Sequence, residues 1–97
     1  LYTLGEIYIG KHSVVSQRSY LCTGSHDYKK IDFSIFSQKI VIGDQCWIAT
    51  DVYIAPGVNI DEGTIVGARS SVFKNLPKHK VCVGNPAKVI KERNIEN

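Results

Sequence analysis

An aliphatic residue recurs at every sixth position through most of the chain. Six successive steps all carry isoleucine or valine, and the same spacing runs through three earlier positions: Ile42, Ile48, Ile54, Ile60, Val66 and Val72, preceded by Ile9, Val15 and Leu21. A strand alternates every two residues and a helix repeats about every 3.6, so neither period explains a step of six. A six-residue repeat is typical of a parallel β-helix, in which short strands stack coil upon coil.

Two further positions of the repeat are restricted in size. The fourth residue after the aliphatic one is small or β-branched: Ser13, Ser19, Ser25, Cys46, Val52, Val58, Thr64 and Ser70. The residue directly after it is glycine or small, with Asp61 and Phe73 as exceptions: Gly10, Ser16, Cys22, Gly43, Ala49, Ala55 and Gly67. We expect the aliphatic residues and the small residues four positions later to point into a three-sided prism of about 18 residues a coil. The glycine or small residue directly after the aliphatic one suits a tightly turning backbone.

The repeat is interrupted once and then ends. Coils are expected over 9–26, 42–59 and 60–77, but Leu21 and Ile42 are 21 residues apart, which is not a multiple of six. Residues 27–41 are therefore predicted to protrude as a loop whose last residues return as strand. The predicted fold is all-β: a parallel β-helix over 1–77 with loop 27–41, then a C-terminal part over 78–97. That part is predicted to hold a strand over 80–83, a turn at 84–86 and a short capping helix over 87–95.

Composition excludes several classes of protein. The chain has 97 residues, enough for one domain, and its net charge of +3 is too small to indicate nucleic-acid binding. No apolar stretch approaches the ~20 residues of a membrane span, and no secretory signal is present, so a cytoplasmic location is expected. The chain has no methionine and begins with leucine, so we expect an N-terminal part to be missing. Cys22, Cys46 and Cys82 lack metal-like spacing and are expected to be buried thiols in a reducing compartment.

Two features could carry chemistry. His26 ends the first coil at the mouth of the predicted loop, and a histidine with its ordinary pKa near ~6.5 can take a proton at neutral pH. A surface histidine bonded to the loop backbone is the alternative. Basic residues also gather in the last quarter: Lys74, Lys78, Lys80, Lys88, Lys91 and Arg93. They form either a solvated tail or an anion site.

Four segments together carry a family resemblance: Gly-Ser-His-Asp at 24–27, Ile-Gly-Asp-Gln-Cys-Trp-Ile-Ala at 42–49, Val-Gly-Ala-Arg-Ser at 66–70 and Gly-Asn-Pro-Ala-Lys-Val-Ile at 84–90. With the repeat, they resemble the hexapeptide-repeat acetyltransferases, and more narrowly the maltose, galactoside and nodulation-type O-acetyltransferases. Residues 20–28 look most like the colanic acid and exopolysaccharide acetyltransferases. The resemblance implies a left-handed β-helix and a homotrimer with an active site between neighbouring chains. It also implies acetyl transfer from acetyl-CoA to a sugar hydroxyl in polysaccharide synthesis.

The resemblance also implies roles for individual residues. His26 matches the general base, Trp47 matches a tryptophan near the thioester, and the acceptor would meet Trp47, Arg18 and Asp27. Arg18 stands where maltose- and galactoside-type enzymes carry asparagine, which suggests an acceptor bearing a carboxylate or phosphate. Contacts to CoA are implied for eight positions: Ala49, Thr50, Gly67, Ala68, Phe73, Lys74, Lys88 and Lys91. Many relatives carry arginine at the last two, so bidentate phosphate binding is lost here.

Other functions were weighed against this one. A non-catalytic β-helix could serve only for oligomerisation or binding. A zinc enzyme of the carbonic anhydrase type needs three histidines at one metal, but His12 and His26 are 14 residues apart rather than one coil, so no metal is expected. Acetyl transfer through Cys22 is possible, although the repeat requires a small residue there.

Overall fold

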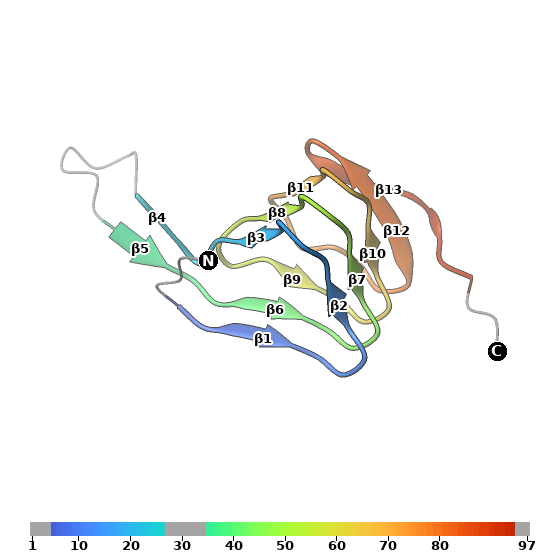
Figure 1. Ribbon diagram of the computed structural model, residues 1–97, viewed down its shortest axis with the longest axis horizontal. Helices are drawn as coiled ribbons and strands as arrows, with labels where there is room; N and C mark the ends of the chain where they lie inside the picture. Colours follow the sequence, from blue (N-terminus) through green and yellow to red (C-terminus); the bar gives the residue numbers. More distant parts are fainter. Residues whose placement is uncertain (1–4, 27–34, 95–97) are drawn as a thin grey trace.

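The computed structural model describes residues 5–26 and 35–94, and its coils stack into a three-sided prism (Figure 1). Each coil contributes one short strand to each of three parallel sheets. The first coil holds β1 (Ile7–Ile9), β2 (Val14–Val15) and β3 (Tyr20–Leu21), the second β6 (Ile40–Ile42), β7 (Trp47–Ile48) and β8 (Tyr53–Ile54), and the third β9 (Asn59–Ile60), β10 (Ile65–Val66) and β11 (Ser71–Val72). The sheets are therefore β1-β6-β9, β2-β7-β10 and β3-β8-β11, each running along the prism.

The register between coils confirms the period that the sequence predicts. Ile48 pairs with Val66, 18 residues further on, and Ile42 and Ile60 are related in the same way. Between the first two coils the step is 33 residues, as between Val15 and Ile48. The 15 additional residues of segment 27–41 are thus inserted without shifting the register of any sheet.

The inserted segment is shorter as a loop than the sequence analysis predicts. β4 (Gly24–His26) pairs antiparallel with β5 (Ile35–Ser37), and β6 already begins at Ile40. Residues 27–34 lie outside the described part of the chain. The insertion leaves and re-enters the prism as a two-stranded ribbon, because antiparallel pairing satisfies backbone groups that a bare loop would leave open.

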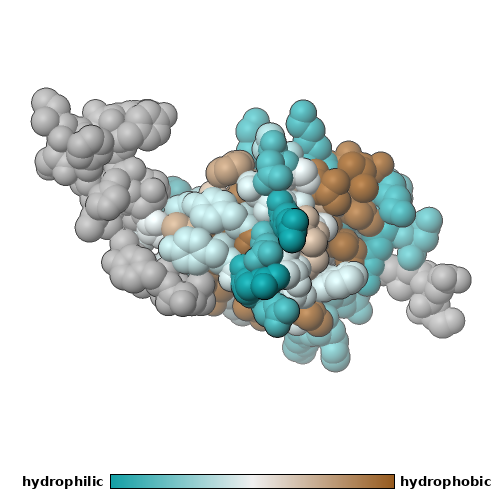
Figure 2. Space-filling view, turned by 45° about the horizontal axis from the view of Figure 1, so that its top comes forward, coloured by the Kyte–Doolittle hydropathy of each residue, from teal (hydrophilic) through white to brown (hydrophobic). Residues whose placement is uncertain are grey.

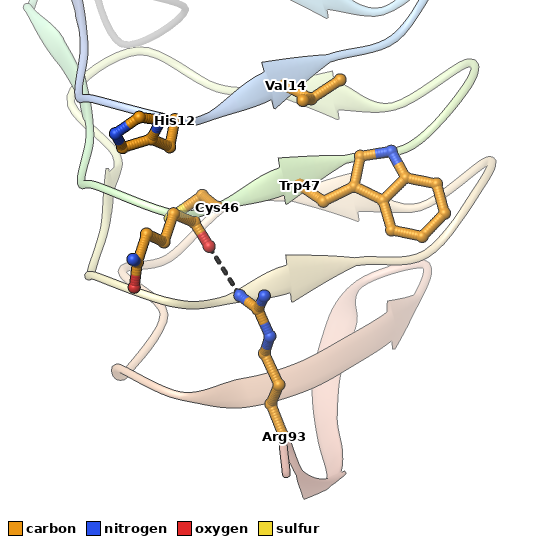
Figure 3. A pocket seen from close by; sticks show the side chains of 6 residues that line it. His12, Val14, Cys46, Trp47 and Arg93 are labelled. Carbon is orange, nitrogen blue, oxygen red and sulfur yellow. Dashed lines mark hydrogen bonds between the residues drawn. The ribbon is translucent and has the colours of Figure 1, made fainter. Parts of the chain in front are cut away.

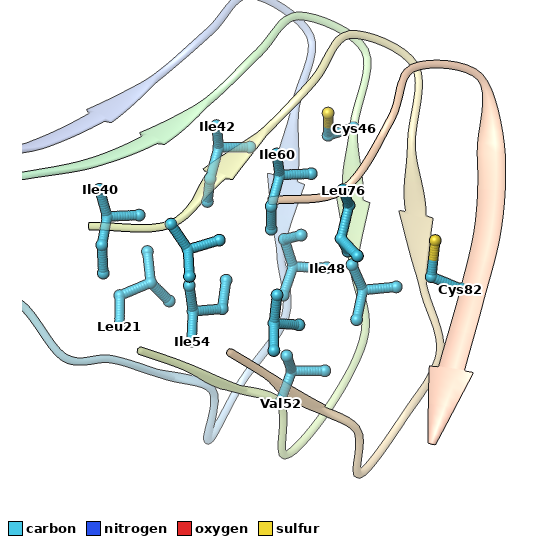
Figure 4. Close-up of a cluster of buried hydrophobic side chains, with 13 residues drawn as sticks. Leu21, Ile40, Ile42, Cys46, Ile48, Val52, Ile54, Ile60, Leu76 and Cys82 are labelled. Atoms are coloured by element: carbon cyan, nitrogen blue, oxygen red, sulfur yellow. The ribbon is translucent and has the colours of Figure 1, made fainter. Parts of the chain in front are cut away.

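The aliphatic residues of the repeat form the core. The six from Ile42 to Val72 are at most 1% exposed (Figure 4). The fourth-position residues of the second and third coils are buried as well: Cys46, Val52, Val58, Thr64 and Ser70. Ile9 holds the same inward position in the first coil but is 44% exposed, since no described coil covers it. Hydroxyls at the fourth position tie adjacent coils together: the Ser13 hydroxyl donates to the Gly43 carbonyl at 2.6 Å and accepts from the Cys46 N–H at 3.0 Å.

Contrary to the sequence prediction, the tight turns at the corners of the prism do not fall on the glycines that directly follow the aliphatic residues. The left-handed backbone conformation falls on the third residue after the aliphatic one, at His12, Arg18, Gln45, Asp51, Gly57, Gly63, Arg69 and His79. The glycines directly after the aliphatic residue are needed instead for close approach between coils. A Cβ at Gly43 would lie 2.8 Å from the Glu62 backbone nitrogen, and one at Gly67 would lie 2.5 Å from Val83 Cγ1.

The repeat resumes after Val72 with two residues deleted. Leu76 forms a parallel bridge with Ile60, and Cys82, six residues further on, is fully buried beneath Val66. Cys82 belongs to β12 (Lys80–Gly84), which contains the predicted strand and extends the central sheet. The prediction that the last coil ends at residue 77 is therefore wrong by one strand.

The predicted C-terminal helix was also wrong. Residues Ala87–Glu92 form strand β13, which pairs antiparallel with β12 and makes the order of the central sheet β13-β12-β10-β7-β2. A helix of nine residues is marginal by itself, whereas the open edge of β12 offers a full row of backbone partners. The described residues contain no helix long and apolar enough to cross a membrane.

Candidate active site

The outer face of the five-stranded sheet gathers half of the predicted donor-binding residues together with Trp47. Paired residues point to the same side, so the registers align one outward row of side chains: Val14, Trp47, Ile65, Val81 and Lys91. Two positions along each strand lies a second outward row, which contains Ala49, Gly67, Val83 and Lys88. Five residues chosen from the sequence (Trp47, Ala49, Gly67, Lys88 and Lys91) therefore share one face.

A β-bulge places the two lysines of β13 side by side on this face. Lys88 pairs with Val83 and Lys91 with Val81, while the register shifts between Val81 and Cys82. Residues three apart on a regular strand point to opposite faces, but the extra residue, Ile90, returns Lys91 to the side of Lys88. Both ammonium groups are exposed. The hairpin thus presents a paired positive charge that a regular strand would not, although the spacing of three would also have placed the two lysines on one face of the predicted helix.

The middle of strand β13 also exposes apolar side chains. Val89 and Ile90 are 46% and 57% exposed, and Figure 2 shows apolar surface at the end of the molecule where the hairpin lies. Lys80 and Glu92 form an ion pair on the side of the hairpin opposite Lys88 and Lys91.

Trp47 divides the outer face of the central sheet. Its indole is half exposed, and Nε1 donates to the Ser16 hydroxyl at 3.1 Å. This hydrogen bond fixes the ring across the neighbouring coil, because β2 and β7 are adjacent. An exposed aromatic ring of defined orientation thus stands on this face, and its place near the reacting groups stays a prediction.

A hollow of about 340 Å³, which we call the Trp47 hollow, lies beside Trp47 at the start of strands β2 and β7. Six residues line it: His12, Val14, Gln45, Cys46, Trp47 and Arg93. Arg93 reaches it from the end of β13, and its Nη1 donates to the Gln45 carbonyl at 2.6 Å (Figure 3). The same nitrogen also donates to the Gly63 carbonyl at 3.0 Å. The sequence indicates Arg93 only as one of the basic residues of a possible anion site, and His12 only in the rejected zinc alternative. Neither could be placed at this hollow, because the approach of Arg93 requires the strand that replaces the predicted helix.

A second hollow, which we call the Phe73 hollow, lies between the hairpin and the end of β11. It measures about 180 Å³ and is lined by Phe73, Lys74, Pro86, Ala87 and Lys88. The Phe73 ring continues an aromatic row, with centroids 5.9 Å from Tyr53 and 5.8 Å between Tyr53 and Tyr20. Burial and a hydrogen bond with Cys22 raise the pKa of Tyr53 to about 12, so this phenol is neutral at physiological pH. The structure therefore brings Phe73, Lys74 and Lys88 together.

The turn residues Thr50 and Ala68 lie at the corner after β7 and β10, beside a stack of charged residues. Arg18 Nε lies 3.2 Å from Asp51 Oδ1, and Arg69 Nε lies 4.0 Å from Asp51 Oδ2. The guanidinium of Arg18 is exposed but already has a carboxylate partner. Its role with an acceptor stays a prediction.

The predicted base lies far from the predicted phosphate contacts within one chain. The backbone of His26 ends β4 and pairs with Ile35. Figure 1 shows the β4–β5 ribbon and the β12–β13 hairpin at opposite sides of the molecule. Asp27 lies outside the described residues.

The three cysteine thiols lie in the interior of the prism, as expected for residues that fill space. Cys22, Cys46 and Cys82 are free and buried, and the Cys22 thiol donates to the Gly24 carbonyl at 2.9 Å. Burial raises the pKa of the Cys46 and Cys82 thiols. Within residues 5–26 and 35–94, no group of three His, Cys, Asp or Glu side chains is placed to hold a metal ion.

Comparison with known proteins identifies the repeat. Residues 39–74 match the family described as "Bacterial transferase hexapeptide (six repeats)". Residues 39–74 thus carry the hexapeptide repeat described for bacterial transferases. It is 68% identical over 93 residues to a protein of Escherichia coli that is provisionally named the colanic acid biosynthesis acetyltransferase WcaF, with 96% of this chain and 51% of the relative covered. The chain thus spans about half the length of the curated relatives it matches.

Solved structures of hexapeptide-repeat acyltransferases share the fold. A galactoside acetyltransferase in complex with coenzyme A superposes with a TM-score of 0.85 at 32% identity, covering 91% of this chain and 46% of that one. AntD, an N-acyltransferase from Bacillus cereus in complex with dTDP-4-amino-4,6-dideoxyglucose and coenzyme A, gives 0.84 at 23% identity, covering 92% and 53%. The second likeness concerns the fold alone. The fold is the left-handed parallel β-helix that the resemblance implied.

Proposed function

We propose that this chain is the catalytic β-helix of an acetyl-CoA-dependent O-acetyltransferase that modifies a sugar hydroxyl in polysaccharide synthesis. The observation that carries the proposal is the shared outer face of Trp47, Ala49, Gly67, Lys88 and Lys91. An aromatic wall, small residues and paired cations follow one another on this face. The 68% identity to a protein named as an acetyltransferase supports the same activity.

The donor would lie along this face with its charged end at the hairpin. Lys88 and Lys91 would contact the phosphates, with Lys74 and Phe73 beside them in the Phe73 hollow. Ala49 and Gly67 present almost no side chain, so a pantetheine arm could lie close to the coils there, with Thr50 and Ala68 at the adjoining corner. The thioester would then reach Trp47.

The chemistry requires one base and accurate positioning. The His26 imidazole would take the proton of the acceptor hydroxyl while the oxygen attacks the thioester carbonyl. The new C–O bond forms, the C–S bond breaks, and the proton passes from the imidazolium to the leaving CoA thiolate. Donor and acceptor held side by side supply much of the rate enhancement, so few catalytic side chains are needed.

A second copy of the chain would complete this site. Because His26 and the Lys88–Lys91 pair lie at opposite sides of one chain, His26 of one copy must approach the outer face of another. A homotrimer with three such contacts, which the family resemblance implies, would meet this requirement, because each copy in a cyclic ring gives and receives one surface. A cytoplasmic location, where acetyl-CoA is made, belongs to the same proposal.

Replacing the base separates chemistry from donor binding. His26→Ala should lower acetyl transfer by at least about 100-fold, the usual contribution of a general base, and leave the dissociation constant of CoA unchanged. His79→Asn is the matched control, because His79 lies at a corner with φ of 55°, which asparagine tolerates. Turnover retained in His26→Ala would remove His26 as the base. A wild-type protein that binds no CoA would favour a non-catalytic module.

A further inference from the structure

The proposed donor path leaves the Trp47 hollow unused. The residues assigned to CoA lie toward the ends of strands β7 and β10 and at the hairpin. The hollow lies at the opposite ends of the strands, where β2 and β7 begin. Trp47 stands between the two regions and belongs to both. A volume of about 340 Å³ lies at the lower end of the range for small-ligand sites and is sufficient for one sugar unit.

Arg93 is held in a geometry suited to an anion. Its Nη1 donates to the Gln45 and Gly63 carbonyls, which uses both N–H bonds of that nitrogen. The Nε and Nη2 edge has no partner among residues 5–26 and 35–94, and such an edge can donate two parallel hydrogen bonds to a carboxylate or phosphate. Because the backbone contacts already fix the guanidinium, little further ordering is needed when an anion binds.

The rest of the lining suits a saccharide. The half-exposed indole of Trp47, bonded to Ser16 just past the end of β2, extends along β7 away from His12 and Arg93 (Figure 3). It borders the hollow on the side toward the strand ends, where it can contact the C–H face of a pyranose ring. His12 and Gln45 supply groups that can hydrogen-bond sugar hydroxyls. The lining contains no Asp or Glu, so nothing in it repels a negative charge or neutralises Arg93.

We propose that the Trp47 hollow binds an anionic sugar unit, with a carboxylate or phosphate on Arg93 and the ring on Trp47. Its role as the acceptor site rests on the proposed function, but the binding itself does not. The hollow lies on the opposite side of Trp47 from the donor track, so sugar and CoA bind at the same time.

The single tryptophan of the chain reports on this hollow directly. Trp47 fluorescence is titrated with methyl β-D-glucuronide, with glucose 1-phosphate and with neutral methyl β-D-glucoside. At least one anionic probe should bind about tenfold or more tightly than the neutral one, and this advantage should shrink as salt is raised. The carboxylate and phosphate arms decide which anion is preferred. Repeating the titration with saturating CoA should leave sugar binding in place.

Variants locate the charge that is responsible. Arg93→Gln should remove the preference for the anionic probe and keep the weak binding of the neutral one. Lys39→Gln, an exposed cation outside the hollow, should change neither. If Arg93→Gln fails to fold, the wild-type comparison of charged and neutral probes still decides. Equal affinity for both probes, displacement of the sugar by CoA, or an unchanged preference in Arg93→Gln would each overturn the proposal. Acetyl transfer to a neutral sugar alone would overturn the anionic site and leave the acetyltransferase activity standing.

Discussion

Each buried aliphatic residue of the prism packs against its equivalents in the coils before and after it. Ile48 lies between Val15 and Val66 in one column, and it is fully buried. A short strand of two residues has few hydrogen bonds of its own, so the column contributes much of the cohesion between coils. Loss of one member therefore weakens two interfaces at once.

Truncating a central column residue tests this packing. Ile48→Ala should lower the free energy of unfolding by about 2–5 kcal/mol, because a cavity forms that the rigid coils cannot close. Ile90→Ala, at a side chain that is 57% exposed, removes the same atoms and should cost far less. Denaturant titration followed by circular dichroism compares the two. Equal losses would mean that the column does not hold the coils together.

The reactivity of the buried cysteines measures, residue by residue, how firmly the coils stay closed. Because burial raises the pKa of Cys46 and Cys82, they hold less reactive thiolate at pH 8 than an ordinary cysteine. The native protein should react with a disulfide reagent at least about 100-fold more slowly at these two positions than the unfolded chain. Labelling followed by peptide mass spectrometry checks this. Fast labelling of the folded protein would show that the coils open readily.

At the scale of elements, the β12–β13 hairpin ends the prism and carries the lysines proposed to contact the donor. β12 buries Cys82 as another coil would, and β13 pairs with it in the opposite direction. The bulge at Ile90 then sets Lys88 and Lys91 on one face and leaves the Lys80–Glu92 ion pair on the other. One irregular residue therefore determines where the charge lies.

Removing the paired charge should weaken donor binding. Lys88→Ala and Lys91→Ala should each raise the dissociation constant of CoA by about tenfold at low salt, as expected for the loss of one charge-assisted contact. The effect should decline at high salt. Lys80→Ala removes a positive charge from the opposite face of the same hairpin and is the matched control. Calorimetric titration that gives the same constant for all three variants would assign the lysines to a solvated surface.

The sequence predicted the regular elements well and the end of the chain poorly. The six-residue period fixes both side-chain direction and register, so the coils and the insertion before Ile42 could be placed by counting. The fate of residues 87–92 depends on a free edge that exists only after β12 has joined the sheet, and local composition favours a helix there. Lys88 and Lys91 could be named from the sequence, and their contact with CoA stays a prediction. The approach of Arg93 to Gln45 and Gly63 depends on β13, so local sequence could not indicate it.

At the scale of the whole molecule, the prism separates the two halves of the proposed site. The ribbon that ends in His26 and the hairpin that carries Lys88 and Lys91 lie at opposite sides of the chain. A stiff stack of coils cannot fold back to bring them together. The proposed activity therefore depends on assembly, and a protein kept monomeric should lose acetyl transfer even if it stays folded.

Mixing two inactive variants tests that dependence most directly. One variant carries His26→Ala, and the other carries Lys88→Ala with Lys91→Ala. Each alone should be nearly inactive at low CoA concentration. After they are unfolded and refolded together in equal amounts, about one quarter of the contacts should join an intact His26 to an intact lysine pair, since each half is intact with a chance of about one half. Recovery of about one quarter of the wild-type rate is the predicted result, and a mixture no more active than its separate components would contradict a site shared between chains.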